Sequence, residues 1–429
     1  MFKQSGEKVI VGYDLGDDYS QISYYIAGGE DVETLSLVAG AQDYNIPTVL
    51  CKRSGVNQWF YGKEAIRYCE ENQGILLKNL LSMAEDGEEV QIEGTGFDPV
   101  ALLTLFFKRS LSMLSAVAPA DKLSALMITC EKLNYRRIEV LSSVVAALRL
   151  KTDKILFQSH TESFYYYMIR QPEELWQART LLFEYQKDFV RIYHMECNKR
   201  TTPVVAFIDS EEVPISAYEP MPEEEGLRGE KLERLDEEFL QVAEKACHNC
   251  VVSSVYLIGE NYSEEWMKKS LRYLCKGRRV FQGNNLYSKG ACYGMMERLH
   301  TSEIGKTHVF LGNDKLKSNI GMKILRRGEE SYYALLDAGI SWFEAQQTLE
   351  FYIQEGNSIE LVITSLIGKG SKRVMIVLEE LKGTLSRLKL HLYLQDENKL
   401  IAEVEDMGLG ELREATHQMW REEIPLYEG

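Results

Sequence analysis

Hydrophobic residues recur along this chain with two periods, and each change of period predicts the end of one element and the start of another. Residues 9–27, VIVGYDLGDDYSQISYYIA, contain an apolar run, a polar turn at 15–18 and a second run that begins at Tyr19. This pattern predicts two strands that turn straight back on each other. Residues 59–65 then predict a short strand, a Gly turn and the start of a helix.

From residue 97 to residue 170 the pattern alternates between helix and strand. Asp98 precedes Pro99 and a segment in which apolar residues recur every three or four positions, so a long helix with Asp98 as its N-cap is predicted over 97–117. The alternation indicates a parallel sheet with helices on its faces. The predicted strands are 124–129 and 154–158, and the predicted helices are 135–148 and 161–170.

A period of two returns at residues 178–207 and predicts three antiparallel strands. Residues 209–225 follow, with seven acidic residues, three prolines and no Lys or Arg. That composition is typical of a solvated linker, and a partner-binding element is the alternative. The segments expected beyond it are helices at 231–247, 263–275 and 286–299 and strands at 254–259 and 279–281.

Past residue 307 the chain contains eight short alternating runs, the first beginning at residue 308 and the last ending at residue 408, separated by Gly, Asn and charged turns, for example at 354–357 and 396–398. Eight such runs in about 120 residues predict an all-β domain, and a sandwich is the expected form.

Composition narrows the classes of function. The 429 residues carry a net charge of −16 and are 45% hydrophobic, so several cores can be buried. No broad basic face is expected for phosphate backbones, which excludes nucleic acid and anionic membrane as predicted partners. The N-terminal segment lacks the apolar core of a secretory signal, and no apolar run approaches the roughly 20 residues that span a bilayer, so a cytoplasmic location is predicted.

The eight cysteines are scattered through apolar segments, which favours reduced core thiols over a disulfide framework.

The motif Gly12-x-Asp14-x-Gly16, placed between an apolar strand and a returning strand, resembles the first phosphate loop of the actin and DnaK-type heat-shock chaperone superfamily. Segments around 124–170, 178–207, 254–270 and 286–299 resemble later parts of the same fold in the same order. The resemblance implies an α/β two-lobed actin-like ATPase fold, made of duplicated ribonuclease-H-like sheets, followed by a C-terminal all-β sandwich domain. Expected boundaries are 1–305 for the ATPase fold (lobe I 1–176, lobe II 177–305, with the acidic linker 209–225 inside it) and 306–429 for the sandwich.

The same resemblance implies the candidate site. The residues placed to contact ATP or ADP with Mg²⁺ are Asp14, Gly16, Gly259 and Gly290. An altered metal site would be built from Asp14, Asp17 and Asp18, and the alternative is that Asp17 and Asp18 are acidic turn residues that face water. Two residues, Glu162 and His160, are candidates for a base that activates water. The alternative there is that Thr161 caps a helix with Glu162 in its first turn.

The second phosphate loop of that superfamily is rich in glycine, whereas residues 184–188 read EYQKD. A short hairpin with bulky side chains is predicted in its place. Two functions follow as hypotheses. One is a chaperone-like pseudo-ATPase of a bacterial cytoplasm, without ATP hydrolysis, that acts as a scaffold or protein-binding module. The other is a divergent chaperone-like ATPase whose binding of protein or peptide is regulated by nucleotide.

Overall fold

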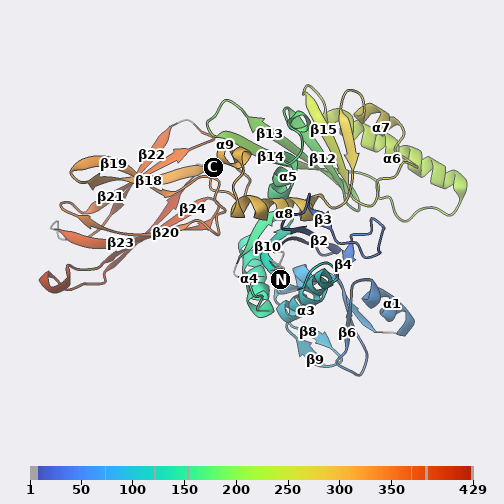
Figure 1. Ribbon diagram of the computed structural model, residues 1–429, viewed down its shortest axis with the longest axis horizontal. Coiled ribbons are helices and arrows are strands. Elements are labelled where there is room, and N and C mark those ends of the chain that lie inside the picture. The colour runs from blue at the N-terminus through green and yellow to red at the C-terminus, as the bar shows by residue number, and fades with distance from the viewer. Residues whose placement is uncertain are drawn as a thin grey trace, which may run out of the picture. The chain divides into compact units, whose positions relative to one another are not determined.

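A computed structural model describes residues 8–72, 74–119, 122–152, 154–368, 370–381 and 385–426 (Figure 1). The chain divides into two compact units, Met1–His308 and Val309–Gly429. The predicted boundary at 305/306 lies close to this division. Residues 1–7, which entered the prediction about a signal segment, lie outside the described residues.

The first unit contains two six-stranded sheets of mixed direction. In the first sheet, the strand order is β11-β10-β1-β2-β3, with β4 paired to β2. Strands β1, β10 and β11 are parallel, and β2 is antiparallel to β1 and to β3. Its strands are β1 (Val9–Leu15), β2 (Tyr19–Ile26), β3 (Glu33–Thr34), β4 (Ile46–Pro47), β10 (Leu123–Cys130) and β11 (Ile155–Ser159).

The second sheet repeats the order and the directions of the first. Its order is β16-β15-β12-β13-β14-β17, with β12, β15 and β16 parallel and with β13 antiparallel to both β12 and β14. The three antiparallel strands predicted at 178–207 are therefore confirmed. The strands are β12 (Arg179–Tyr185), β13 (Phe189–Asn198), β14 (Val204–Pro214), β15 (Val252–Ile258), β16 (Arg279–Gln282) and, at the boundary of the units, β17 (His308–Phe310).

The linker predicted at 209–225 is wrong for its first part, because residues 209–214 belong to β14 and pair with β13. Val213 and Ile215 pack on the core of the second sheet, so apolar residues at alternate positions continue the strand despite the acidic residues between them. The helix after this segment also begins earlier than predicted.

The strands of each sheet alternate with helices at corresponding positions in the chain. The helices of the first half are α3 (Pro99–Leu111), α4 (Tyr135–Leu148) and α5 (His160–Ile169), and those of the second half are α6 (Glu225–Ala246), α7 (Lys269–Leu274) and α8 (Leu286–Leu299). The predicted cap is confirmed, because the Asp98 side chain accepts a hydrogen bond from Val100 N. In α5, however, Ser159 rather than Thr161 is the N-cap, with its hydroxyl accepting from Glu162 N.

Shorter elements complete the first unit. They are helices α1 (Gly62–Asn72), α2 (Leu80–Asp86) and α9 (Glu303–Thr307), a three-stranded sheet of β5 (Leu50–Lys52), β6 (Trp59–Tyr61) and β7 (Ile75–Leu77), and a hairpin of β8 (Val90–Ile92) and β9 (Thr95–Phe97).

Helices α5 and α8 join the two halves of the first unit. They pack against each other, and α8, which follows the second sheet in the chain, lies on β1, β2 and β10 of the first sheet (Figure 1). Ala291 and Met295 of α8 share a core cluster with Ala125 and Met127 of β10. A Cβ atom on Gly12 of β1 would lie 2.2 Å from Ser288 O, so the helix backbone directly contacts the strand backbone.

In the second unit, the described residues form two four-stranded antiparallel sheets. One has the order β19-β18-β21-β22 and the other β20-β23-β24-β25. Alternate residues are buried; in β23, for example, Leu388, Leu390 and Leu392 are nearly inaccessible. The strands are β18 (Ser318–Arg326), β19 (Glu329–Leu336), β20 (Gln346–Ile353), β21 (Ser358–Ser365), β22 (Ser371–Val377), β23 (Ser386–Asp396), β24 (Lys399–Asp406) and β25 (Met419–Pro425).

Candidate functional site

Ionisable side chains gather where the parallel strands of both sheets end. Asp14 lies near the end of β1, Glu131 follows β10, and His160 begins α5 directly after β11. From the second sheet, Glu184 lies near the end of β12 and Arg191 comes from the adjacent β13. In α/β sheets the carboxyl ends of parallel strands are the usual place for ligands. These five residues, with Tyr193 and Tyr287 beside them, are called the central cluster.

His160 is held on two sides. Its Nε2 lies 2.8 Å from Asp14 Oδ1, and its ring stacks on Tyr287 of α8 with centroids 3.8 Å apart. Both residues of the pair are buried, with Asp14 4% and His160 9% exposed. The other ring nitrogen, Nδ1, is buried without a hydrogen-bond partner among the described residues. The first half of the chain thus supplies the ion pair and the second half supplies the ring that covers it.

Arg191 is the cation of the second half. Its guanidinium contacts three carboxylates, with nitrogen-to-oxygen distances of 2.9 Å to Glu131, 3.6 Å to Glu184 and 2.7 Å to Glu212. The Tyr193 hydroxyl donates to Glu184 at 3.2 Å. Since Glu131 follows a strand of the first sheet, the Arg191–Glu131 pair is an ionic link between the two sheets.

The cluster has more acid than base. Four carboxyl groups, counting Glu212, face one guanidinium and one imidazole. Burial raises the pKa of the Glu184 carboxyl, although His160 and Arg191 oppose that change. Burial disfavours the charged form of His160, but the Asp14 carboxylate and its hydrogen bond outweigh this and raise the pKa of the imidazole. The folded protein therefore holds protons on both groups more tightly than an open chain does.

Polar side chains also connect the halves beside the cluster. Gln21 Nε2 of β2 donates to Asn284 O at 2.6 Å, and it also donates to Asn45 Oδ1. Asn45 in turn donates to the Glu260 carboxylate just after β15. These contacts, together with Arg191–Glu131, connect the two halves of the first unit at several points.

The three acidic residues proposed as metal ligands do not converge. The Asp17 carboxylate accepts from Leu81 N and Ser82 N at 2.9 and 3.1 Å, at the start of α2. Asp18 is exposed, and Asp14 is paired with His160. Among the residues that the structure describes, no group of three or more His, Cys, Asp or Glu side chains is placed to hold a metal ion.

The candidate glycines serve close packing of backbone. A Cβ on Gly290 would lie 2.0 Å from Ser163 O, where α8 crosses α5. Gly259 has a φ of 115°, and its Cβ would lie 2.7 Å from Tyr185 O. At Gly16 the nearest atom would be Tyr19 O at 2.9 Å, across the tight turn between β1 and β2. The two candidate bases do not share a site. Glu162 lies 3.8 Å from Arg298, whereas His160 belongs to the central cluster.

The hairpin predicted at 184–188 is present. Gln186 N donates to Phe189 O at 2.9 Å and closes the turn between β12 and β13, with Lys187 exposed at its tip. The sequence analysis missed Glu131, Arg191, Tyr193 and Tyr287 as members of a site. One signal was available for Arg191, namely a charged residue at the centre of the otherwise apolar run FVRIY.

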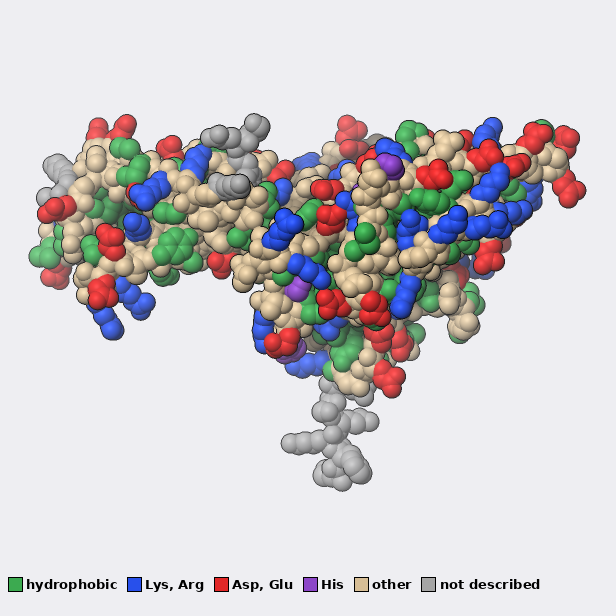
Figure 2. Space-filling view, turned by 90° about the horizontal axis from the view of Figure 1, so that it is seen from above, with side chains coloured by type: hydrophobic (Ala, Val, Ile, Leu, Met, Phe, Trp, Pro, Cys, Tyr) green, Lys and Arg blue, Asp and Glu red, His purple; other side chains and the backbone are tan. Residues whose placement is uncertain are grey.

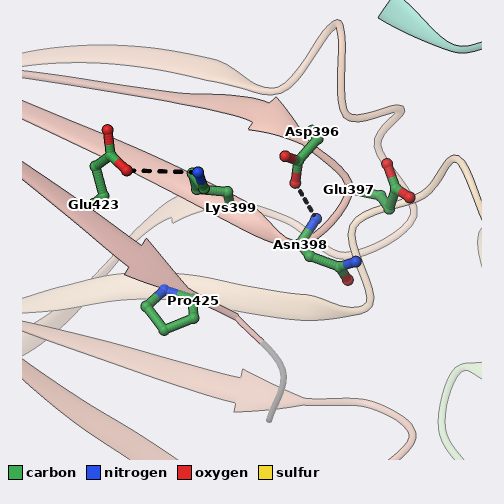
Figure 3. Close-up of a pocket in the computed structure, with 6 residues that line it drawn as sticks. All are labelled: Asp396, Glu397, Asn398, Lys399, Glu423 and Pro425. Atoms are coloured by element: carbon green, nitrogen blue, oxygen red, sulfur yellow. Dashed lines mark hydrogen bonds and ion pairs between the residues drawn. The ribbon is translucent and has the colours of Figure 1, made fainter. Parts of the chain in front are cut away.

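Two open depressions lie on the surface away from the cluster. One, of about 510 Å³, lies in the second unit beside the β23–β24 turn and is lined by acidic residues with Lys399 paired to Glu423 (Figure 3). The other, of about 290 Å³, lies on the second sheet of the first unit, where His194 is 3.5 Å from Glu211. Neither includes a residue of the central cluster.

The fold and the cluster define a mixed α/β protein with a repeated sheet and an ionic centre between the repeats. A family model described as the C-terminal part of a family of unknown function (DUF5716) matches residues 31–313, which is more than half of the chain, so the protein belongs to this family. A domain of unknown function (DUF8552) matches residues 315–426. No curated protein matches the chain. Among the described residues, no helix is long and apolar enough to cross a membrane.

The raised pKa of His160 gives a prediction about pH. A group that binds its proton more tightly when folded stabilises the fold fully below its unfolded pKa, about 6.5 for His, and the stabilisation is lost as pH rises through the folded pKa. Replacement His160→Gln should therefore lower the free energy of unfolding more at pH 6 than at pH 9, measured by urea titration. The control His300→Gln, at an exposed position, should change it little at either pH. An equal loss for His160→Gln at both pH values would contradict the charged pair.

Proposed function

We propose that this protein is a chaperone-like pseudo-ATPase of the cytoplasm, in which an actin-like two-lobed fold followed by a β-sandwich acts as a protein-binding scaffold without hydrolysing ATP. The repeated strand order of the two sheets supports the two-lobed fold. The helix that follows each sheet, α5 or α8, packs at the junction of the two, as expected for lobes joined by crossing helices. The buried alternate residues of the second unit support a sandwich.

The observation that carries the proposal is the central cluster. In the superfamily that the sequence resembles, nucleotide binds between the lobes against the loops that correspond here to 14–18 and 184–188. In this protein the same region holds the stacked His160 and Tyr287 rings and the Arg191 side chain, all buried. Since protein interiors are close-packed, side chains fixed there by ion pairs exclude a ligand unless the lobes move apart.

Electrostatics supports the same conclusion. A nucleotide brings several negative charges, and the two cationic groups of the central cluster are already shared by its three carboxyl groups and by Glu212. Two like unit charges 4 Å apart in a protein repel each other by about 4 kcal/mol. A nucleotide phosphate would meet this repulsion unless a cation lay between the charges. No glycine remains in 184–188 to bring backbone N–H groups to a phosphate.

Protein binding is supported by the surface of the second unit. Of fifteen large apolar side chains that are exposed among the described residues, nine lie in this unit, for example Tyr352 at 61% and Met375 at 51%. The unit accounts for less than a third of the chain. Exposed apolar side chains concentrated in one domain are typical of a surface that contacts other proteins.

A nucleotide titration tests the proposal. A ligand that binds only the folded protein raises the unfolding midpoint, and a site with a Kd of about 50 μM would add about 2.7 kcal/mol at about 5 mM ligand. We expect no shift and no heat of binding with ATP or ADP, each with Mg²⁺, in thermal-shift and calorimetric measurements. A clear shift that is lost in Asp14→Ala and kept in Asp18→Ala would overturn the proposal in favour of a divergent ATP-binding chaperone-like protein.

A further inference from the structure

Two cysteines that are distant in sequence meet beside the small three-stranded sheet of the first unit. Cys51 lies at the centre of β5, paired with Phe60 of β6 and with Leu76 of β7, and it is fully buried. Cys69 lies on α1, which packs on β5, and it is half-buried. Both are free thiols. The proposed function makes no use of them.

Both sulfur atoms lie against Gly74. The Cys69 thiol donates to Gly74 O at 3.0 Å, and a Cβ atom on Gly74 would lie 2.5 Å from Cys51 Sγ. A glycine at this position therefore leaves room for the Cys51 sulfur. The two cysteines also belong to one apolar cluster, to which Phe60 and Tyr68 contribute stacked rings with centroids 4.1 Å apart. The fold thus brings the two thiols together in an apolar setting.

The two thiols differ in what can reach them. Burial, the neighbouring Cys69 thiol and a hydrogen bond between the two thiols raise the pKa of Cys51 to about 11. Cys51 is therefore a protonated, buried thiol at neutral pH, and such a thiol does not react directly with a reagent in solution. Cys69 is the member of the pair that solvent reaches. A reagent must act on Cys69 first, with Cys51 beside it for a second step.

The charge around Cys69 favours an uncharged oxidant. Arg67, Glu70 and Glu71 are the exposed charged side chains nearest to it in sequence on α1, so one cation faces two carboxylates. Asp and Glu side chains are also spread over the face of the molecule in Figure 2, as expected from the net charge of −16. Such a surface repels anionic oxidants such as glutathione disulfide, whereas it does not repel hydrogen peroxide or an organic hydroperoxide. A peroxide is the class of reactant that fits.

We propose that Cys51 and Cys69 form a redox-modification site, at which a peroxide converts the two neighbouring thiols into a reversible disulfide between β5 and α1. In the first step the Cys69 sulfur attacks one peroxide oxygen and the O–O bond breaks. Cys69 becomes a sulfenic acid, and the other oxygen leaves as water or as an alcohol. This site is separate from the central cluster and goes beyond the proposed scaffold role.

The second step joins the two sulfurs. The Cys51 sulfur attacks the Cys69 sulfur, the S–O bond breaks, and the Cys51 proton leaves with the hydroxide as water. In total, two electrons pass from the two sulfurs to the peroxide. A dithiol reductant reverses the reaction by thiol–disulfide exchange. Because a cross-link restricts the unfolded chain more than the folded one, the disulfide should stabilise the segment that it closes.

The test uses the full chain, first reduced and then treated with a small excess of hydrogen peroxide at neutral pH. Remaining thiols are blocked with N-ethylmaleimide, and the protein is mapped by mass spectrometry without reduction. We expect the main product to lack two hydrogen atoms and to link the peptides of Cys51 and Cys69. Dithiothreitol should restore both thiols. In urea titration the oxidised protein should unfold at a higher midpoint than the reduced protein.

Three variants separate the roles of the residues. In Cys51→Ala the second step is impossible, so the Cys69 sulfenic acid should accumulate and its labelling by dimedone should rise roughly tenfold. In Gly74→Ala the new Cβ would displace the Cys51 sulfur, so the link should form severalfold more slowly while the circular dichroism spectrum stays unchanged. The control Cys250→Ala removes another half-buried thiol, which donates to Ala246 O at 3.5 Å, and should leave the rate of linkage unchanged.

Three results would overturn the inference. The first is dimedone labelling of Cys69 that is equal in the original protein and in Cys51→Ala, because Cys51 would then take no part. The second is a link that forms equally fast in urea-unfolded protein, because the fold would then contribute nothing to the pairing. The third is a Cys69 that stays reduced while the exposed Cys275 is oxidised, because Cys69 would then be closed to peroxide.

Discussion

Replacement Gly290→Ala should strongly destabilise the protein, although Ala is the better helix former. In an exposed helix the change would stabilise by about 1 kcal/mol. In α8, however, the new Cβ would lie 2.0 Å from Ser163 O, a backbone atom of α5 that cannot rotate away. The helices must separate, and overpacking of this kind costs about 1–3 kcal/mol or more. Chemical unfolding of the variant should show a lower midpoint.

Gly229 provides a matched control within the same protein. It also lies in a helix, α6, but a Cβ there would meet no atom within 4 Å. Gly229→Ala should therefore raise the free energy of unfolding by as much as about 1 kcal/mol. If both variants shifted stability in the same direction, the close crossing of α5 and α8 would be contradicted.

Replacement Arg191→Leu should cost about 3–5 kcal/mol, since it leaves the buried Glu184 carboxyl without the guanidinium beside it. Arg191 is 8% exposed and contacts three carboxylates, of which Glu184 is equally buried. Urea unfolding gives the loss directly. A small loss, close to that for an exposed pair such as Arg387–Glu350, would show that the central cluster is open to water.

A second substitution separates the charge effect from simple loss of packing. Adding Glu184→Gln to Arg191→Leu should recover part of the lost stability, because an amide needs no cation. The coupling between the two sites should lie in the range of about 0.5–3 kcal/mol. Purely additive effects would indicate that Arg191 acts only by filling space.

Many strands and helices of the first unit could be predicted from the local pattern of apolar and polar residues. Helix 286–299 was predicted at its observed bounds, because Gly290 and Gly294 did not interrupt an otherwise continuous apolar face. Helix 263–275 was predicted too long: Ser263 begins a turn, and α7 starts only at Lys269. In the second unit β25 was missed, since only Trp420 and Ile424 of its residues are buried and the charged residues between them hide the period of two.

The site was harder to predict because its members are far apart in sequence. Asp14 and His160 meet only through the parallel pairing of β1, β10 and β11, and Tyr287 reaches them from a helix at the end of the first unit. For the acidic turn, closeness in sequence led to a wrong grouping. Asp14, Asp17 and Asp18 are neighbours in sequence, but the Asp17 carboxylate accepts hydrogen bonds from the first turn of α2 instead. Local spacing suggests ligands, but the fold determines which side chains share a space.

The contact of α8 with β1 also constrains how the chain can be made. Gly12 of β1 is in close contact with a helix that begins only at Leu286. The Cys292 thiol of that helix donates to Ile10 O across 282 positions of sequence. At about 5–20 residues per second of synthesis, the end of α8 is made only about 7–28 s after the last strand of the first sheet. During that time the apolar surface around Ala125 and Met127 lacks the helix that covers it in the folded protein, and transiently exposed apolar surface of this kind favours aggregation of a nascent chain.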